Sequence, residues 1–425
     1  MKKFTKIFAF ILTLSITFAT LNGCTIIQLG QSSNANLGGI GNYDNNVTVN
    51  VTASNTVQYN SVVEMIEAVS PTVYEVYAKE NGSNGYSAGS GTVIGDNIPK
   101  EPTDEKNPVT YFVLTCHHII DSTDLYMVKD MYGNEFNARL IGGDADTDIA
   151  VICFTPEEDG YLPVEGNPNA YTKDGKTITI KKAQVRLDKN SDGTDSNPIK
   201  VGESVYAIGN ALGVFGGSVS HGIISAKSRE ITIEGIKMEL MQTDCLVNKG
   251  NSGCGLFDEQ GNLVGVINGG YTGEVQGINF AIPSDTAFNV FTQLVSTYSG
   301  VNYGYVVGRA SFKVSLDALT NVSDLAVYQY KSFKGDTTVY VGEVGSVLKG
   351  KLQVNDVIKS VQVRNGSTYT VSTASSLVSY FEGLKFSIGD KIVFNVVRNN
   401  LNVKVEIELE QYIYKNTGVY KTEEE

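Results

Sequence analysis

The chain has 425 residues, including 44 glycines, 23 tyrosines, 17 phenylalanines and no tryptophan, and its formal net charge is −13. This length suggests two or three folding units, each large enough to bury its own core. The acidic balance argues against nucleic acid as a partner. Many short Val/Ile/Thr runs, broken by Gly, Asn and Asp, predict a mostly β protein.

The N-terminus has the pattern of an export signal. Three lysines lie in the first six residues, an apolar run covers 8–19, and Leu-Asn-Gly stands immediately before Cys24. The run is too short for a membrane span. We expect residues 1–23 to be a lipoprotein signal peptide, Cys24 to be lipidated, and the protein to be anchored to the extracytoplasmic face of a bacterial membrane. An ordinary secretory peptide or an uncleaved anchor are the alternatives.

Residues 24–59 are rich in Asn, Ser, Gly and Thr and nearly free of charge. This composition predicts a flexible tether. The alternation of Val and Thr over 47–52 is compatible with a short strand that finds a partner. Loss of residues 1–23 would remove three lysines and no acid, so the mature net charge would be −16. The lipid, rather than a basic patch, would then hold the protein on the membrane.

A first folded unit is predicted over residues 60–292. Residues 111–115 are expected to form a buried strand, 141–148 a strand and turn, and 237–244 a further strand. Each of them leads to a candidate chemical group: His118 follows the first, Asp148 ends the second and Ser252 follows the third. The Gly-Asn-Ser-Gly string around Ser252 is by itself equally typical of a polar turn. The order His, Asp, Ser is that of the chymotrypsin arrangement among known triads, and it shifts the expected fold toward paired β-barrels.

The segments around these residues resemble the HtrA/Deg family of trypsin-like serine proteases, which carry a C-terminal PDZ domain. The resemblance covers about residues 60–412. Its collinear motifs are Val62 to Val73, Ala88-Gly89-Ser90-Gly91, Leu114 to Ile120, Thr147-Asp148-Ile149-Ala150-Val151, Val201 to Asn210, Gly222 to Ser225 and Gly277 to Pro283. The chain departs from the family at Cys116 and His117, where two asparagines are usual, at Lys249, where Pro is usual, and at Cys254-Gly255, where Gly-Pro is usual.

The resemblance implies a chymotrypsin-like double β-barrel and a mechanism. His118 would take the proton of Ser252 as Oγ attacks the scissile carbonyl, and Asp148 would orient the imidazole. The backbone amides of Gly250 and Ser252 would form the oxyanion hole. No metal and no cofactor is expected.

Other residues compete for these roles. His117 adjoins His118, and neighbours on a strand face opposite ways, so only one can face Ser252; the family pattern selects His118. Asp144 and Asp146 lie near Asp148 and are expected in the turn. His221 is expected to be a spectator.

Four cysteines besides Cys24 leave three complete disulfide connectivities open, and we favour a Cys116–Cys254 pair over four buried thiols. A cysteine-protease mechanism is disfavoured because Cys254 has no oxyanion-type loop of its own. A zinc site at Cys116, His117 and His118 is disfavoured because adjacent strand residues cannot converge on one ion.

The substrate pocket is expected to be apolar. Leu246 stands six residues before Ser252, where trypsin-like folds place the pocket floor, and Ile267 and Ile278 lie nearby in sequence. Cleavage after small or medium aliphatic residues is the hypothesis. Residues 161–198 are longer than the matching family segment. They contain an incomplete calcium-loop spacing from Asp188, with Ile199 in the twelfth position, so an extended hairpin is favoured.

From residue 300 the chain changes character. Residues 300–412 resemble a PDZ domain, with a helix at 373–381 lining a peptide groove and a carboxylate loop at Val306, Val307 and Gly308. Arg309 stands where an apolar residue is usual, and a degenerate domain used for packing or assembly is the alternative. Residues 413–425 are expected to be an acidic tail.

Two functions follow. The first is an endopeptidase that cleaves unfolded or misfolded exported polypeptides in extracytoplasmic quality control, assembled as a homo-oligomer, a trimer by family resemblance. The alternative is a catalytically impaired, protease-like chaperone or peptide-binding module.

Overall fold

The computed structural model describes most of the chain from residue 47 to 411 and two short strands before it. The described residues are 16–21, 24–29, 47–52, 57–80, 82, 85–97, 108–121, 123–188, 197–211, 215–233, 236–270, 277–299, 303–308, 314–316, 325–331, 337–345, 348–382, 384 and 386–411. The chain divides into two compact units. Unit 1 comprises 1–141, 148–227 and 241–296, and unit 2 comprises 142–147, 228–240 and 297–425.

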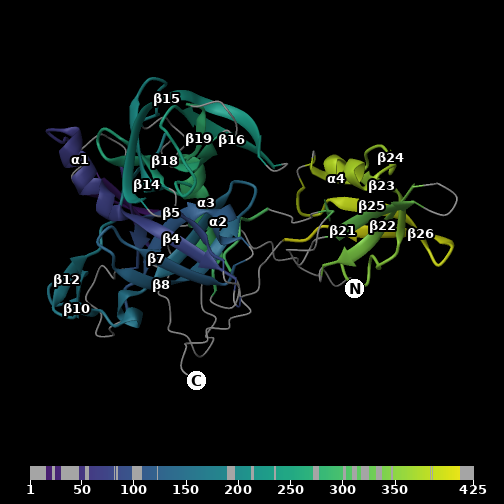
Figure 1. The fold of residues 1–425 in the computed structure, drawn as a ribbon, viewed down its shortest axis with the longest axis horizontal. Coiled ribbons are helices and arrows are strands. Elements are labelled where there is room, and N and C mark those ends of the chain that lie inside the picture. The colour runs from purple at the N-terminus through teal and green to yellow at the C-terminus, as the bar shows by residue number, and fades with distance from the viewer. Residues whose placement is uncertain are drawn as a thin grey trace, which may run out of the picture. The chain divides into compact units, whose positions relative to one another are not determined.

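Six strands of the first half of unit 1 close into a barrel (Figure 1). Their order is β5-β4-β7-β8-β9-β6, and a further pairing of β5 with β6 closes the ring. The strands are β4 (Val73–Lys79), β5 (Ser87–Asp96), β6 (Tyr111–Cys116), β7 (Leu125–Lys129), β8 (Glu135–Asp144) and β9 (Ile149–Phe154). Aromatic rings fill the interior: the ring of Phe154 lies 4.8 Å from Phe136 and 5.5 Å from Tyr74 and Tyr111, between centroids.

A second barrel has the order β17-β14-β15-β16-β19-β18, closed by the pairing of β17 with β18. Its strands are β14 (Ser204–Ala211), β15 (Phe215–Ile233), β16 (Ile236–Thr243), β17 (Gly255–Asp258), β18 (Asn262–Gly270) and β19 (Asn279–Pro283). Its core consists mainly of small aliphatic side chains, among them Val205, Ile224, Leu256 and Ile267. Two closed six-stranded barrels are the chymotrypsin-like arrangement, so the mostly β, double-barrel fold expected from the sequence is confirmed.

Short helices complete unit 1. They are α1 (Val62–Val69), α2 (His117–Ile120), α3 (Ser284–Thr297) and the 3-10 turns η1 (Ser70–Thr72) and η2 (Pro156–Asp159). Ser61 caps α1, because its side chain accepts a hydrogen bond from the amide of Glu64. The apolar side of α3 packs inward, and the ring of its Phe291 meets that of Phe112 edge-on at 6.2 Å.

The range expected to be a flexible tether contains a structural strand. β3 (Thr48–Thr52) pairs antiparallel with β5 and parallel with β13 (Gln184–Arg186). Val47, Val49 and Val51 are 2%, 1% and 6% exposed. Alternate valines on one face of a strand are buried together. The segment 47–52 therefore belongs to the folded unit, and the expectation of a flexible tether does not hold for this part of 24–59.

The residues before β3 contribute two strands, β1 (Ile16–Leu21) and β2 (Cys24–Leu29), with β2 antiparallel to β3. Most of the predicted signal peptide, and the acidic tail at 413–425, lie outside the described residues. Among the described residues, no helix combines the length and apolar character needed to cross a membrane.

The insertion at 161–198 begins as a small separate sheet and returns to the barrels. β10 (Leu162–Val164), β11 (Asn167–Lys173) and β12 (Lys176–Thr179) form an antiparallel sheet, as expected for an extended hairpin. Arg186 of β13, which is 3% exposed, then ties the insertion to the second barrel. Its guanidinium donates to Glu203 at 2.9 Å, to Asp258 at 3.0 Å and to the carbonyl of Asn197 at 2.9 Å.

Unit 2 is a twisted sheet covered by one helix (Figure 1). The sheet order is β20-β21-β22-β23-β25-β26, with β24 beside β23. Its elements are β20 (Val314–Ser315), β21 (Leu325–Lys331), β22 (Thr337–Val344), β23 (Val357–Val363), β24 (Tyr369–Thr370), α4 (Ala374–Glu382), β25 (Lys391–Arg398) and β26 (Leu401–Glu408). The expected helix at 373–381 is therefore present, displaced by one residue.

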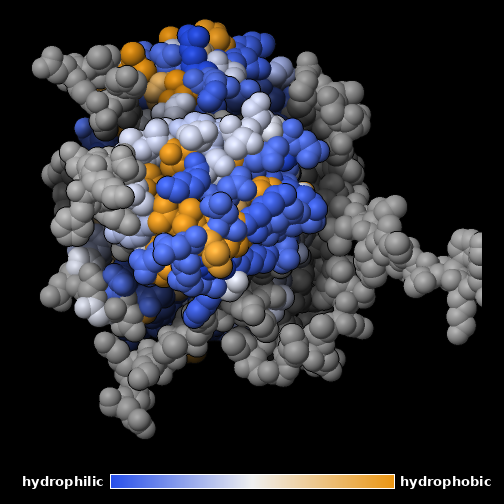
Figure 2. Space-filling view, turned by 90° about the vertical axis from the view of Figure 1, so that its right-hand side faces the viewer, coloured by the Kyte–Doolittle hydropathy of each residue, from blue (hydrophilic) through white to orange (hydrophobic). Residues whose placement is uncertain are grey.

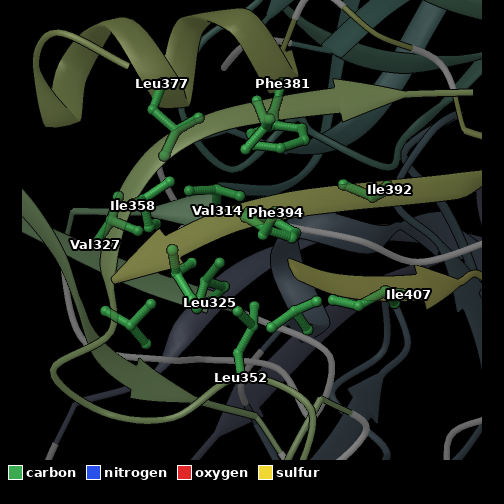
Figure 3. Packing of buried hydrophobic residues seen from close by; sticks show 14 of the residues in the cluster. Val314, Leu325, Val327, Leu352, Ile358, Leu377, Phe381, Ile392, Phe394 and Ile407 are labelled. Carbon is green, nitrogen blue, oxygen red and sulfur yellow. The ribbon is translucent and has the colours of Figure 1, made fainter. Parts of the chain in front are cut away.

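One apolar cluster holds unit 2 together. Figure 3 shows Leu377 and Phe381 of α4 pointing from the helix toward the sheet, where Phe394 and Ile358 lie. Leu377 and Phe394 are 0% exposed. Burying a side chain of this size stabilises a fold by about 1.5–3 kcal/mol, so this helix contributes to the core as well as to the surface.

We predict that Arg186→Ala lowers the free energy of unfolding of unit 1 by about 3–5 kcal/mol, because Asp258 (2% exposed) would lose its cation. Calorimetry of the full chain would measure the change. Lys237→Ala is the matched control: it breaks an ion pair with Glu230 whose side chains are 51% and 66% exposed, and such pairs contribute about 0–1 kcal/mol. Equal effects of the two substitutions would contradict a structural role for the buried network.

Candidate active site

His118 lies in the turn that follows β6. The chain leaves the strand at Cys116 and enters the short helix α2, so His117 and His118 occupy a helical turn and not the strand end that alternation assumed. The ring Nδ1 of His118 lies 2.7 Å from Asp148 Oδ2, and the His118 amide donates to Asp148 Oδ1 at 2.8 Å. With Nδ1 bound to a carboxylate, the proton belongs on Nδ1 and Nε2 is left as the acceptor.

Asp148 is a buried carboxylate held by several donors. It is 5% exposed and stands in the turn immediately before β9 with φ +57°, a left-handed conformation that aspartate tolerates better than most residues. Its carbonyl accepts the amide of His117 at 2.9 Å. Besides both His118 bonds, its Oδ2 accepts the side-chain amide of Asn268 at 2.6 Å. A buried carboxylate with this many donors has one fixed orientation.

Asn268 connects Asp148 to Ser252. It lies on β18, is 6% exposed, and donates from Nδ2 to Asp148 while its backbone carbonyl accepts the Ser252 hydroxyl at 3.2 Å. Sequence reasoning did not select this residue. Its position sixteen residues after Ser252, directly after the buried Ile267, gives no chemical signal until the barrel closes.

Ser252 stands in a loop shaped by two glycines. Gly250 has φ +90° and Gly253 has φ +81°, which side-chain-bearing residues rarely adopt. A Cβ on Gly253 would lie 2.1 Å from the carbonyl oxygen of Ser90 on β5, so that position has no room for a side chain. The glycines therefore let the loop approach the first barrel closely enough to place the serine.

The amides of Gly250 and Ser252 differ from the other polar groups of the loop. The surrounding loop groups are paired: Asn251 donates to the Asn248 carbonyl at 3.1 Å, Gly253 to Ile267 at 2.8 Å and Cys254 to Asn251 at 2.9 Å. Within the described residues, the amides of Gly250 and Ser252 donate to no protein acceptor. Two unpaired amides beside a serine can bind a negatively charged oxygen.

The competing residues occupy other settings. The ring of His221 stacks on Tyr206 at 4.7 Å between centroids. Asp144 is the last residue of β8, and its carboxylate accepts the hydroxyl of Thr147 in the turn that follows, at 2.7 Å. His117 bonds Asp148 through its backbone amide.

The three predicted pocket residues do not share one environment. Leu246 is 60% exposed, Ile278 is half-buried, and Ile267 is 0% exposed within the apolar core of the second barrel. The side chain of Ile267 is therefore committed to packing, which a position on a linear sequence does not reveal. A role in the pocket stays a prediction for Leu246 and Ile278.

The four cysteines of the barrels are free thiols, so the Cys116–Cys254 disulfide favoured from sequence is wrong for this structure. All four are buried, and two bond backbone carbonyls: Cys116 to Ile267 and Cys245 to Val205, each at 3.4 Å. Burial raises the pKa of Cys153 to about 11, and it also raises the pKa of Cys116. A raised pKa keeps each of these thiols protonated and unreactive at neutral pH.

One group among the described residues has the donor types of a metal site. The thiol of Cys116, the imidazole of His118 and the carboxylate of Asp148 lie within 4.8 Å of one another. The set differs from the Cys116–His117–His118 group considered from sequence. The imidazole of His118 and the carboxylate of Asp148 already hydrogen-bond each other, so two of the three groups are paired without an ion.

Comparison with known proteins matches the same region. Residues 89–266 match the model of a trypsin-like peptidase domain. The chain is 33% identical over 304 residues to "Probable periplasmic serine endoprotease DegP-like" of Pseudomonas savastanoi pv. phaseolicola, covering 70% of this chain and 53% of that protein. It is 31% identical over 310 residues to the protein of the same name from Hahella chejuensis, covering 72% and 56%.

Among solved structures, "HtrA-type protease AlgW with tripeptide" matches with a TM-score of 0.43 and 23% identity, covering 84% of this chain and 100% of that one. The chain spans about half the length of the curated relatives it matches. The sequence matches support a relationship to the DegP-like, trypsin-like serine proteases.

We predict that Asn268→Ala lowers kcat/KM for a cleavable peptide by about 10- to 100-fold, because a hydrogen bond to a charged group contributes about 1.5–3 kcal/mol. Steady-state kinetics and thermal unfolding of the same samples would measure it. Asn262→Ala is the matched control, since Asn262 is a buried amide of the same strand that donates to Asp258 at 3.0 Å. If both variants lost activity only in proportion to stability, Asn268 would have no special role.

Proposed function

We propose that this chain is a serine endopeptidase that cleaves unfolded or misfolded exported polypeptides, with Ser252 as nucleophile, His118 as general base and Asp148 as the orienting acid. The observation that carries the proposal is the buried Asp148 carboxylate, bonded at once to the ring of His118 and to Asn268, whose carbonyl holds the Ser252 hydroxyl. The matched trypsin-like peptidase domain, residues 89–266, contains His118, Asp148 and Ser252, and Asn268 follows two residues after its end.

The chemistry follows from this arrangement. The Ser252 hydroxyl rotates from the Asn268 carbonyl toward Nε2 of His118, which takes the proton as Oγ attacks the scissile carbonyl. The imidazolium that forms is stabilised by Asp148, and it later protonates the leaving amine. The developing oxyanion accepts the amides of Gly250 and Ser252, where each donor contributes about 3 kcal/mol.

The proposed substrates are polypeptides cleaved after small or medium aliphatic residues. Leu246 and Ile278 are the candidate pocket residues, and Leu246 carries no charge that would select Lys or Arg. Profiling with a mixed peptide library tests this, and preferred cleavage after Arg would contradict it.

We also propose an extracytoplasmic location with a lipid on Cys24. The matched relatives are named as periplasmic, and the lysine-rich start, apolar run and Cys24 form the pattern of a lipoprotein signal. Loss of the protein from the membrane fraction in Cys24→Ser tests the anchor. A trimer follows from the family resemblance alone, and light scattering measures it.

Unit 2 is proposed to be a PDZ-like peptide-binding domain. Its sheet carries one helix, α4, and the loop at Val306, Val307 and Gly308 is the candidate carboxylate site. Gly308 has φ +91°, and Val307 is 60% exposed. Figure 2 shows one face of the molecule on which apolar side chains gather in patches between hydrophilic ones. Arg309 lies outside the described residues.

One contact bears on this loop. Gln411 closes over it, accepting the Gly308 amide at 3.0 Å and donating to the Val306 carbonyl at 3.2 Å. A peptide carboxylate would have to displace this side chain to reach the Gly308 amide.

We predict that His118→Ala and Ser252→Ala each lower the hydrolysis of unfolded casein by about 10⁴-fold or more, since members of a triad act as a unit. Labelling of Ser252 by a fluorophosphonate probe should vanish in Ser252→Ala. His117→Ala is the neighbouring control and should stay within roughly threefold of the parent. The full chain is used because truncation at residue 60 would remove β3 from the sheet.

A folded parent protein that neither labels nor cleaves would overturn the protease assignment. If that protein also suppressed aggregation of an unfolded client, the chaperone alternative would replace it.

We predict that Gln411→Ala tightens the binding of a hydrophobic peptide with a free C-terminus by about fivefold, the equivalent of one neutral hydrogen bond. The same peptide with an amidated C-terminus should bind more weakly to both proteins. Fluorescence anisotropy measures the four dissociation constants. Equal affinities for the free and amidated peptides would contradict carboxylate capture at this loop.

A further inference from the structure

Ser90 of β5 contacts the nucleophile loop (residues 248–254) through both its backbone and its side chain. It is 0% exposed. Its amide donates to the carbonyl of Ser252 at 2.9 Å, and its hydroxyl donates to the carbonyl of Gly250 at 2.9 Å. One residue of the first barrel thus bonds the carbonyl of each of the two residues whose amides would bind the oxyanion.

These bonds fix the peptide planes of the loop. The peptide between Gly250 and Asn251 is held at its carbonyl by Ser90 and at its amide by the carbonyl of Asn248. The peptide between Ser252 and Gly253 is held in the same way, by the Ser90 amide and the Ile267 carbonyl. A peptide plane bonded at both ends cannot rotate without losing two hydrogen bonds, so the loop between them keeps one conformation.

Ser90 is itself anchored. Its carbonyl accepts the hydroxyl of Thr115 at 2.7 Å, and Thr115 lies on β6, which leads to His118. A Cβ on Gly209 would lie 2.9 Å from the Ser90 hydroxyl oxygen, so the hydroxyl occupies a space that this glycine leaves open. Ser90 therefore connects the nucleophile loop to β6, the strand that precedes His118.

The loop needs such a restraint because its own residues are permissive. Gly250 has almost no steric preference for one conformation over another, and Lys249 before it carries no ring that would fix the backbone. Gly250 is buried, and a buried carbonyl without a donor is costly. Without the Ser90 hydroxyl, that carbonyl would turn toward another donor and carry the adjoining amides with it.

We propose that Ser90 is a positioning residue of the reaction: its hydroxyl latches the Gly250 carbonyl and thereby holds the amides of Gly250 and Ser252 in the orientation that binds the oxyanion. The proposal rests on the proposed serine endopeptidase function. Ser90 acts through the loop and touches neither substrate nor nucleophile oxygen, so its loss should weaken stabilisation of the transition state and leave substrate binding nearly unchanged.

The test compares Ser90→Ala with Thr92→Val in the full chain. Thr92 is a matched control because it lies on the same strand, is 0% exposed, and its hydroxyl has no partner among the described residues. Each variant loses one buried hydroxyl of β5. Values of kcat and KM are measured on a peptide substrate, with the concentration of competent enzyme set by fluorophosphonate titration. The inhibition constant of a peptide trifluoromethyl ketone, whose adduct with serine carries an oxyanion, is measured alongside.

Ser90→Ala should lower kcat by about tenfold or more, the effect of losing one hydrogen bond that orients the hole, with KM within about twofold of the parent. Its inhibition constant for the ketone should rise by the same factor by which kcat/KM falls. Thr92→Val should leave all three values near those of the parent.

Three results would contradict the proposed positioning role of Ser90. They are an unchanged kcat in Ser90→Ala, equal losses in both variants that follow their unfolding temperatures, and a rise in KM that accounts for the whole loss. A parent protein that neither turns over nor labels would instead overturn the proposed function, and with it the reaction that the latch serves.

Discussion

The organisation of the site depends on one buried carboxylate. Asp148 is 5% exposed, and an ionised carboxylate at such a position is stable only when donors surround it. Those donors come from different parts of the chain: both the amide and the ring of His118 from α2, and the side chain of Asn268 from β18. Satisfying this single charge therefore draws together the histidine of the first barrel and a strand of the second. The left-handed backbone at Asp148, with φ +57°, is a local strain that these bonds offset.

The nucleophile loop illustrates a second constraint, which is the division of its hydrogen-bonding groups between structure and chemistry. Most of the loop's amides and carbonyls are paired with Ser90, Asn248 and Ile267. The amides of Gly250 and Ser252 are exceptions, because they donate to no protein acceptor within the described part of the chain. A loop with every group paired would have no capacity to bind an oxyanion, and a loop with few pairs would have no fixed geometry. Bonds from β5 resolve this conflict by restraining the carbonyls.

Buried polar groups also hold the parts of unit 1 that the sequence left undecided. Arg186 closes the return of the 161–198 insertion through Glu203 and Asp258, while β3 completes the sheet between β5 and β13. The cysteines, by contrast, contribute as small buried thiols. All four are free, and the Sγ atoms of Cys116 and Cys245 donate to the backbone carbonyls of Ile267 and Val205.

The sequence by itself determined the β class and the double barrel, because local strand patterns and short motifs in a fixed order carry that information. It also selected His118, Asp148 and Ser252, whose catalytic roles stay predictions. The helix at 373–381 was expected from the resemblance of residues 300–412 to a PDZ domain. Only the tertiary structure decided that β3 is part of the sheet, that Ile267 packs in the core, and that Asn268 and Ser90 bond the site. These last roles arise between strands brought together by barrel closure, and a hydrogen bond between residues 160 positions apart, such as that of Ser90 with Gly250, leaves no pattern in the linear sequence.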